Sequence, residues 1–79
     1  MGVITVRYFA AAAAAAGVDG ESLRAGSADA VRSAMIDAHP ALAAVLDRCA
    51  LLADGVRVEG SDEVAAGATL DVLPPFAGG

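Results

Sequence analysis

Hydrophobic and polar residues alternate along the first segment of the chain, residues 3–9. Such alternation is typical of a strand with one buried face, because successive side chains of a strand point to opposite sides of the sheet. The expected buried side consists of Ile4, Val6 and Tyr8, and the other side carries Thr5, Arg7 and Phe9. The chain is therefore predicted to open with a strand whose outer face displays an aromatic residue beside a charged one.

Two further segments have the composition and spacing of helices. The alanine run over residues 10–16 favours a helix by intrinsic propensity, and Gly17 is a suitable residue to end it. Over residues 28–39, apolar residues recur at helical spacing after Ser27, a good N-cap. The expected core-facing residues are Ala28, Val31, Ala34, Met35 and Ala38. This amphipathic segment is predicted to be the main helix, and Pro40 ends it.

The rest of the chain predicts short elements joined by turns. Further strands are expected over residues 21–24, 49–53, 56–58 and 69–73, and a second helical piece over residues 41–47. Asp54-Gly55 is a strong signal for a tight hairpin turn between two of these strands. In the last strand Leu70 and Val72 face one way, whereas Asp71 and Leu73 face the other.

Composition and charge exclude several classes of function. The chain has 79 residues, enough for one domain, and a net charge of −5. Its cations are scattered arginines, so we expect no binding to nucleic acid. The alanine run is too short to span a membrane, and the strand pattern before it argues against a secretory signal. We therefore expect a cytoplasmic protein that is steered toward a basic surface on a partner.

Cys49 and His39 are the two side chains with obvious reactive chemistry. Cys49 is the only cysteine, which leaves no internal disulfide and no multi-cysteine metal site. We interpret it as a small buried hydrophobic residue, with a spatial pairing to His39 left open. His39 precedes Pro40 and is interpreted as a solvated residue. No metal site is expected.

The C-terminal residues combine features that suggest engagement by a partner. Pro74 and Pro75 fix φ and remove two backbone donors, so the sheet is expected to end at Leu73. We divide the chain into a domain, residues 1–73, and a flexible tail, residues 74–79. An exposed aromatic residue, Phe76, favours a groove on another protein over an inert frayed end. Ala77, Gly78 and Gly79 leave little steric bulk near a terminal carboxylate that is ionised at neutral pH and needs activation, most simply by ATP.

These residues resemble the ubiquitin-like sulfur carriers, and in particular the MoaD family, the small subunit of molybdopterin synthase. The resemblance rests on the strand that ends at Tyr8-Phe9-Ala10, the alanine-rich helix, the helix that closes at His39-Pro40, the turn over residues 51–55, and the terminal Leu73-Pro74-Pro75-Phe76-Ala77-Gly78-Gly79. The last seven residues are the specific part. Carriers of the thiazole pathway also end in Gly-Gly but generally lack the preceding proline pair.

The resemblance implies an α+β, β-grasp (ubiquitin-like) fold, a mixed sheet packed against one main helix. The first and last strands would pair in parallel, so that Ile4, Val6, Leu70 and Val72 share the helix-facing side. Phe9 and Leu73 would then lie together on the opposite face, which docks on partners in this family. The implied partner-binding residues are Phe9, Leu73, Pro74, Pro75, Phe76, Ala77 and Gly78, with Arg7 as a weaker candidate.

The chemistry implied by the resemblance takes place at Gly79. An activating enzyme (MoeB-like) adenylates the terminal carboxylate with ATP and Mg²⁺, and a sulfurtransferase converts it to a thiocarboxylate. The large synthase subunit (MoaE-like) then holds the tail against cyclic pyranopterin monophosphate. The carrier itself binds no cofactor and is not an enzyme. The alternatives are a sulfur carrier for thiazole or amino acid synthesis, a ubiquitin-like protein modifier, and a non-covalent adaptor.

Overall fold

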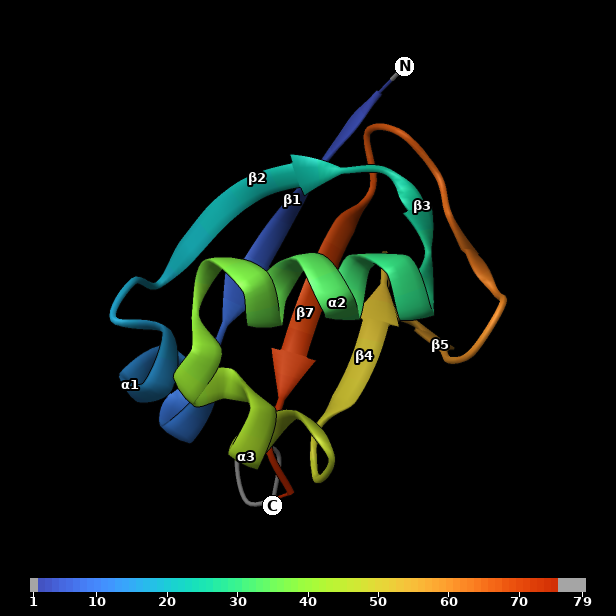
Figure 1. Ribbon diagram of the computed structural model, residues 1–79. Helices are drawn as coiled ribbons and strands as arrows, with labels where there is room; N and C mark the ends of the chain where they lie inside the picture. Colours follow the sequence, from blue (N-terminus) through green and yellow to red (C-terminus); the bar gives the residue numbers. More distant parts are fainter. Residues whose placement is uncertain (1, 76–79) are drawn as a thin grey trace.

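A five-stranded mixed sheet with helices on one face forms the body of the computed structural model, which describes residues 2–75 (Figure 1). The strand order is β2-β1-β7-β4-β5, with β1 and β7 parallel and the other neighbouring pairs antiparallel. The strands are β1 (Val3–Tyr8), β2 (Gly20–Arg24), β4 (Ala50–Ala53), β5 (Val56–Val58) and β7 (Thr69–Leu73). The α+β, β-grasp architecture expected from the sequence is therefore confirmed.

The pairing of β1 with β7 sets the two faces of the sheet. Its register places Val6 beside Leu70 and Arg7 beside Asp71. Since side chains alternate along a strand, one such pair lies on the helix side and the next on the open side. The predicted inner residues of both strands, Ile4, Val6, Leu70 and Val72, are at most 1% exposed. The strand phases read from the sequence are thus confirmed.

The helical segments cover this inner face. They are α1 (Ala10–Ala16), α2 (Ala28–Ala38), the 3₁₀ turn η1 (Pro40–Leu42) and α3 (Ala43–Leu46). As Figure 1 shows, α2 crosses the sheet, and it buries Val31 and Met35. The prediction that Ala38 faces the core is wrong, because Leu42 of η1, which packs against α2, is the fully buried residue at this end. None of the helices within residues 2–75 is long and apolar enough to cross a membrane.

A second, two-stranded sheet was not expected from the sequence. It pairs β3 (Gly26–Ser27) with β6 (Glu63–Val64). The pairing brings the loop before β6 against the start of α2, where the backbone N–H groups of Ala28 and Asp29 donate to the carbonyls of Asp62 and Gly60. The Ser27 hydroxyl also accepts from the N–H of Ala30 at 3.1 Å. The first turn of α2 is therefore capped by the chain itself.

The hairpin between β4 and β5 forms at the predicted turn. Asp54 and Gly55 both have positive φ, 48° and 84°. Two-residue hairpins favour this geometry because its twist matches that of the flanking strands. The hairpin makes β5 one edge of the sheet, and β2 forms the other edge.

Candidate functional site

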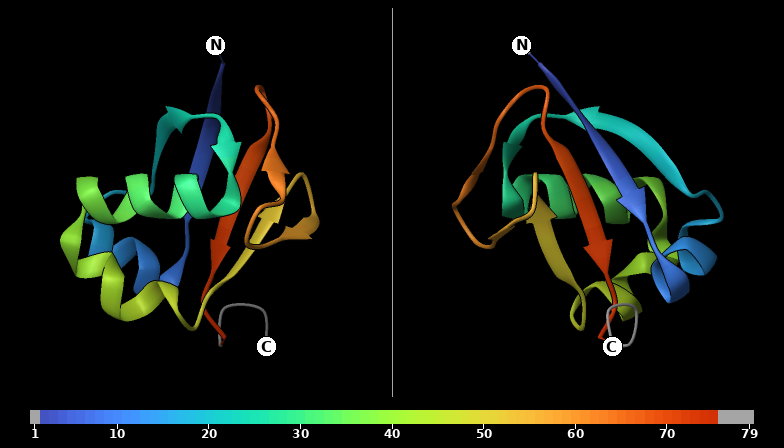
Figure 2. Two further views of the ribbon diagram at one scale, coloured as in Figure 1. Left: turned by 45° about the vertical axis from the view of Figure 1, so that its right-hand side comes forward. Right: turned by 180° about the vertical axis from the view of Figure 1, so that it is seen from behind.

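The face of the sheet opposite the helices is open along its central strands (Figure 2). Phe9 follows β1 in an extended conformation, and its N–H donates to the carbonyl of Val72 at 3.3 Å. This continues the register of β1 with β7, so Phe9 and Leu73 both lie on the open face, and both are half-buried. The structure therefore brings together the two apolar residues that the sequence placed on this face.

An ion pair crosses the two central strands beside these apolar residues. Arg7 Nε donates to Asp71 Oδ1 at 2.6 Å, and Arg7 Nη2 donates to Asp71 Oδ2 at 2.8 Å. The carboxylate of Asp71 raises the pKa of Arg7 through these hydrogen bonds and its charge. The guanidinium carbon also lies 5.6 Å from the centre of the Phe9 ring. A bidentate pair of this kind fixes the direction of the guanidinium, so the centre of the open face has a defined shape.

Asp71 is a site residue that sequence reasoning missed, although its outward direction was predicted. The signal was available, because a parallel register of the first and last strands places Asp71 directly beside Arg7.

Where β7 ends, the two prolines differ in their surroundings. Pro74 is buried and Pro75 is exposed. Both line a cleft of about 330 Å³, which we call the tail-root cleft. Its walls are Asp47, Arg48, Cys49, Ala50, Arg57, Leu73, Pro74 and Pro75. Phe76, Ala77, Gly78 and Gly79, predicted as site residues, lie outside the described residues.

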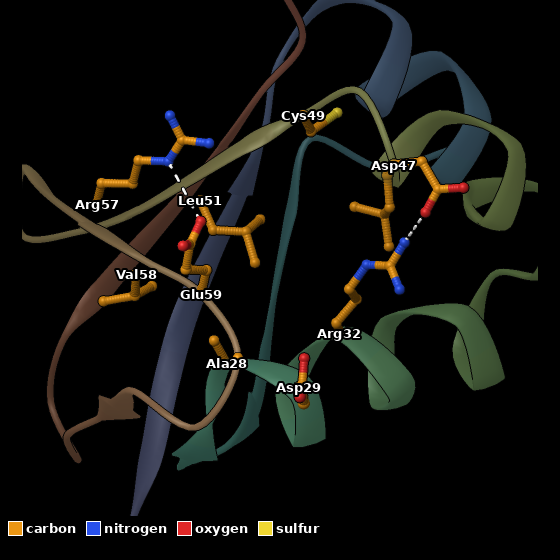
Figure 3. Close-up of a pocket in the computed structure, with 11 residues that line it drawn as sticks. Ala28, Asp29, Arg32, Asp47, Cys49, Leu51, Arg57, Val58 and Glu59 are labelled. Atoms are coloured by element: carbon orange, nitrogen blue, oxygen red, sulfur yellow. Dashed lines mark hydrogen bonds and ion pairs between the residues drawn. The ribbon is translucent and has the colours of Figure 1, made fainter.

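A neighbouring cavity of similar volume separates the start of α2 from the hairpin of β4 and β5 (Figure 3). Two ion pairs flank it, Arg32 with Asp47 and Arg57 with Glu59. Asp47, Arg57 and Cys49 line both this cavity and the tail-root cleft.

Cys49 lines both cavities but is not activated. Its thiol donates to the carbonyl of Val45 at 3.3 Å, and burial raises its pKa. A raised pKa keeps the thiol protonated at neutral pH, whereas the thiolate is the reactive form. Cys49 is half-buried and packs against the core, in agreement with its interpretation as a small hydrophobic residue.

His39 is not the solvated residue that the sequence suggested. Its Nε2 lies 2.9 Å from Glu21 Oε2, its ring meets that of Tyr8 edge-on, and its side chain is only 19% exposed. The residue ends α2, which carries it over β2, so a partner distant in sequence removes it from solvent. The pairing with Cys49 that the sequence left open is replaced by this contact with Glu21.

The same carboxylate also accepts a hydrogen bond from Tyr8, at 2.5 Å between Tyr8 Oη and Glu21 Oε2. Burial, followed by this hydrogen bond and the charge of Glu21, raises the pKa of Tyr8. Tyr8, Glu21 and His39 thus form a polar network on the helix side that joins β1, β2 and the end of α2.

We expect this network to make the protein less stable in alkaline solution. A tyrosine whose folded pKa is raised contributes stability that is complete below its unfolded pKa of about 10 and is lost as the pH rises above that value. Denaturant unfolding at increasing pH should show this decline, and Tyr8→Phe should remove part of it. The raised pKa of Cys49 also lowers the stability at alkaline pH, and it does so equally in the unchanged protein and in Tyr8→Phe. Because Tyr8 is the only tyrosine, its absorbance reports the titration directly, and a folded-state midpoint near 10 would contradict the prediction.

Within residues 2–75, no three His, Cys, Asp or Glu side chains gather closely enough to hold a metal ion. The described residues instead offer two surfaces at the end of β7: the open face with Phe9, Arg7, Asp71 and Leu73, and the tail-root cleft. Both are suited to binding another protein beside the C-terminal residues.

The overall structure is similar to small ubiquitin-like proteins of known structure. SAMP1 from Haloferax volcanii has 27% identity and a TM-score of 0.84, with 99% of this chain and 100% of that chain covered. A putative molybdopterin converting factor, subunit 1, from Pyrococcus furiosus has 23% identity and a TM-score of 0.81, with 96% and 100% covered. A complex of subunits 1 and 2 of the molybdopterin-converting factor from Helicobacter pylori 26695 matches at 20% identity and a TM-score of 0.71, with 98% and 99% covered.

No protein-family model and no curated protein matches the chain. The structural similarity nevertheless extends over nearly the whole chain. The chain therefore has the ubiquitin-like β-grasp fold that SAMP1 and subunit 1 of the molybdopterin converting factor share.

Proposed function

We propose that this protein is a cytoplasmic sulfur carrier of molybdenum cofactor biosynthesis, the small subunit of a molybdopterin synthase. One observation supports it most: the central strand β7 ends at Leu73, and the sequence continues directly as Pro-Pro-Phe-Ala-Gly-Gly. The same fold occurs in a putative molybdopterin converting factor subunit 1. A rigid domain would thereby present the Gly79 carboxylate to other proteins.

The proposed chemistry takes place at the carbonyl carbon of Gly79. An ionised carboxylate is a poor electrophile, so one of its oxygens first attacks the α-phosphate of Mg²⁺-bound ATP and pyrophosphate leaves. A sulfide equivalent from a sulfurtransferase then displaces AMP and leaves a thiocarboxylate. Within the synthase, this sulfur would be transferred to cyclic pyranopterin monophosphate. The carrier supplies the reacting group, and its partners supply nucleotide, metal and catalytic side chains.

In this proposal the open face and the tail have separate roles. Phe9 and Leu73 would contact the partner, with the ion pair of Arg7 and Asp71 setting the shape between them. Pro74, Pro75, Phe76, Ala77 and Gly78 would lie in the partner's channel. A large-subunit partner is supported by the Helicobacter pylori complex of subunits 1 and 2, because a chain of that complex shares this fold. An adenylating enzyme and a sulfurtransferase follow from the chemistry that Gly79 requires.

A protein modifier is the second candidate, favoured by the similarity to SAMP1, a small archaeal modifier protein. The activated carbonyl of Gly79 would then be attacked by a lysine amine to form an isopeptide bond. A sulfur carrier for thiazole or amino acid synthesis would use the same first steps and differ only in the protein that accepts the sulfur.

Intact-mass measurement distinguishes these functions. The protein is incubated with an adenylating enzyme, ATP and a sulfur donor, and we expect the mass change of one oxygen-to-sulfur exchange, confined to Gly79 by peptide mapping. The reaction without ATP is the control. A ladder of larger covalent adducts in a lysate would favour the modifier, and a protein that stays unmodified with every activating enzyme tested would contradict both.

A further inference from the structure

The tail-root cleft gathers positive charge in an otherwise acidic chain. Arg48 and Arg57 line it, and its one acidic residue is Asp47, whereas the whole chain has a net charge of −5. The Asp47 carboxylate pairs with Arg32, as Figure 3 shows. Because Arg32 does not line the cleft, this pair neutralises Asp47 from outside. The two arginines therefore set the charge of the cleft.

Both arginines keep donors available for a ligand. Within residues 2–75, Arg48 has no ion-pair partner, and Arg57 Nε is 3.9 Å from Glu59 Oε1 with both side chains at least 70% exposed. At that distance and exposure, the attraction between the two charges is weak. Arg7 differs, because Asp71 already accepts two of its hydrogen bonds.

The other walls of the cleft connect these charges to the tail. Leu73, Pro74 and Pro75 form one side, so a protein that encloses the tail must also cover the mouth of the cleft. Ala50 and Pro74 contribute apolar side chains to the cleft, and a partner that covers the cleft excludes water, which strengthens charge interactions there. Guanidinium groups match a carboxylate in shape as well as charge, since two parallel N–H groups meet two oxygens.

We infer that the tail-root cleft binds an aspartate or glutamate side chain of the protein that takes up the tail. This inference rests on the proposed function, because it requires that a partner enclose the tail. The acidic surface of the domain would draw it toward a basic partner, and the carboxylate would select the one orientation in which the tail enters the active site. The cleft thus acts as an orienting contact beside the reactive end.

The test uses the full chain and the adenylating enzyme that loads it, with the KM for the carrier and the kcat of loading measured separately. Arg48→Glu and Arg57→Glu each place a negative charge in the cleft, and we expect each to raise KM at least about tenfold with kcat little changed. Arg24→Glu is the matched control, since β2 is the opposite edge of the sheet from β5. Added salt should reduce the difference between Arg48→Glu and the unchanged protein. Thermal unfolding confirms that each variant is folded.

The test distinguishes a failure of the inference about the cleft from a failure of the proposed function. If the unchanged protein is loaded and Arg48→Glu, Arg57→Glu and Arg24→Glu all have the same KM, the inference about the cleft is overturned and the proposed function stands. If no adenylating enzyme loads the unchanged protein, the proposed function fails and the inference fails with it. A Glu→Arg substitution in the enzyme that restores the KM of Arg48→Glu would identify the carboxylate directly.

Discussion

Adding one alanine after Gly79 is expected to abolish sulfur loading and to leave the stability of the domain unchanged. The added residue moves the terminal carboxylate by up to about 3.6 Å and places a methyl group where two glycines had none. A displacement of even about 1 Å at a reacting centre can slow a reaction about 100-fold. The buried core within residues 2–75 runs from Ile4 to Val72, and the extension changes none of these residues, so we expect the stability of the domain to stay the same. Intact-mass kinetics and thermal unfolding measure the two effects.

An added glycine is the matched control for this extension, because it changes the length of the tail without adding a side chain. Both extensions should fail to load if the position of the carboxylate is read by the enzyme. Loading of the alanine-extended protein at the ordinary rate, with sulfur found on the new terminus, would contradict the proposal that Gly79 is the reacting residue.

The main helix and the strands were predictable because their signals are local, whereas their β-grasp arrangement was expected from the family resemblance. Alternation in β1 and β7 identified Ile4 and Leu70 as inner residues, and both are buried. The cap at Ser27 and the turn at Asp54-Gly55 depend on neighbouring residues only, and both form as expected. For the cap and the turn, the free energy that decides the structure comes from residues close together in the chain, so a single sequence contains the signal.

The features that escaped prediction depend on contacts between distant segments. Glu21 and His39 are 18 positions apart, and they meet only because α2 crosses the sheet and ends over β2. The pairing of β3 with β6 involves strands of two residues each, which are too short for any periodic pattern. Such contacts follow from the topology of the whole domain, and their residues look like ordinary surface positions in the sequence.

The candidate site was predictable in part for the same reason. Strand phase, together with the parallel pairing that the resemblance implied, placed Phe9 and Leu73 on one face. The ion pair of Arg7 with Asp71 depends in addition on the exact register of that pairing. The tail-root cleft could not be predicted, because Arg48 lies in the turn before β4 and Arg57 lies in β5, and only the folded structure brings both beside Pro74. The contribution of these residues to binding stays a prediction until partners are tested.

Leu70 and Leu73 offer a test that separates the two faces of the same strand. Leu70 is 0% exposed on the inner face of β7, between β1 and β4. Leu70→Ala should therefore cost about 2–5 kcal/mol of the free energy of unfolding, through lost burial and the cavity left behind. Leu73 is half-buried on the open face, and Leu73→Ala should cost less stability. Denaturant unfolding of both variants measures this difference.

For partner binding we expect the opposite order, with Leu73→Ala having a larger effect than Leu70→Ala. Leu73→Ala removes an apolar contact at the proposed interface, so we expect the Kd for the large synthase subunit to rise about tenfold or more. Leu70→Ala leaves that surface in place, and under conditions where the variant is folded its Kd should stay close to that of the unchanged protein. If Leu70→Ala weakened binding as much as Leu73→Ala while fully folded, binding would depend on the interior of the domain and not on its open face. The open face would then have to be abandoned as the docking surface.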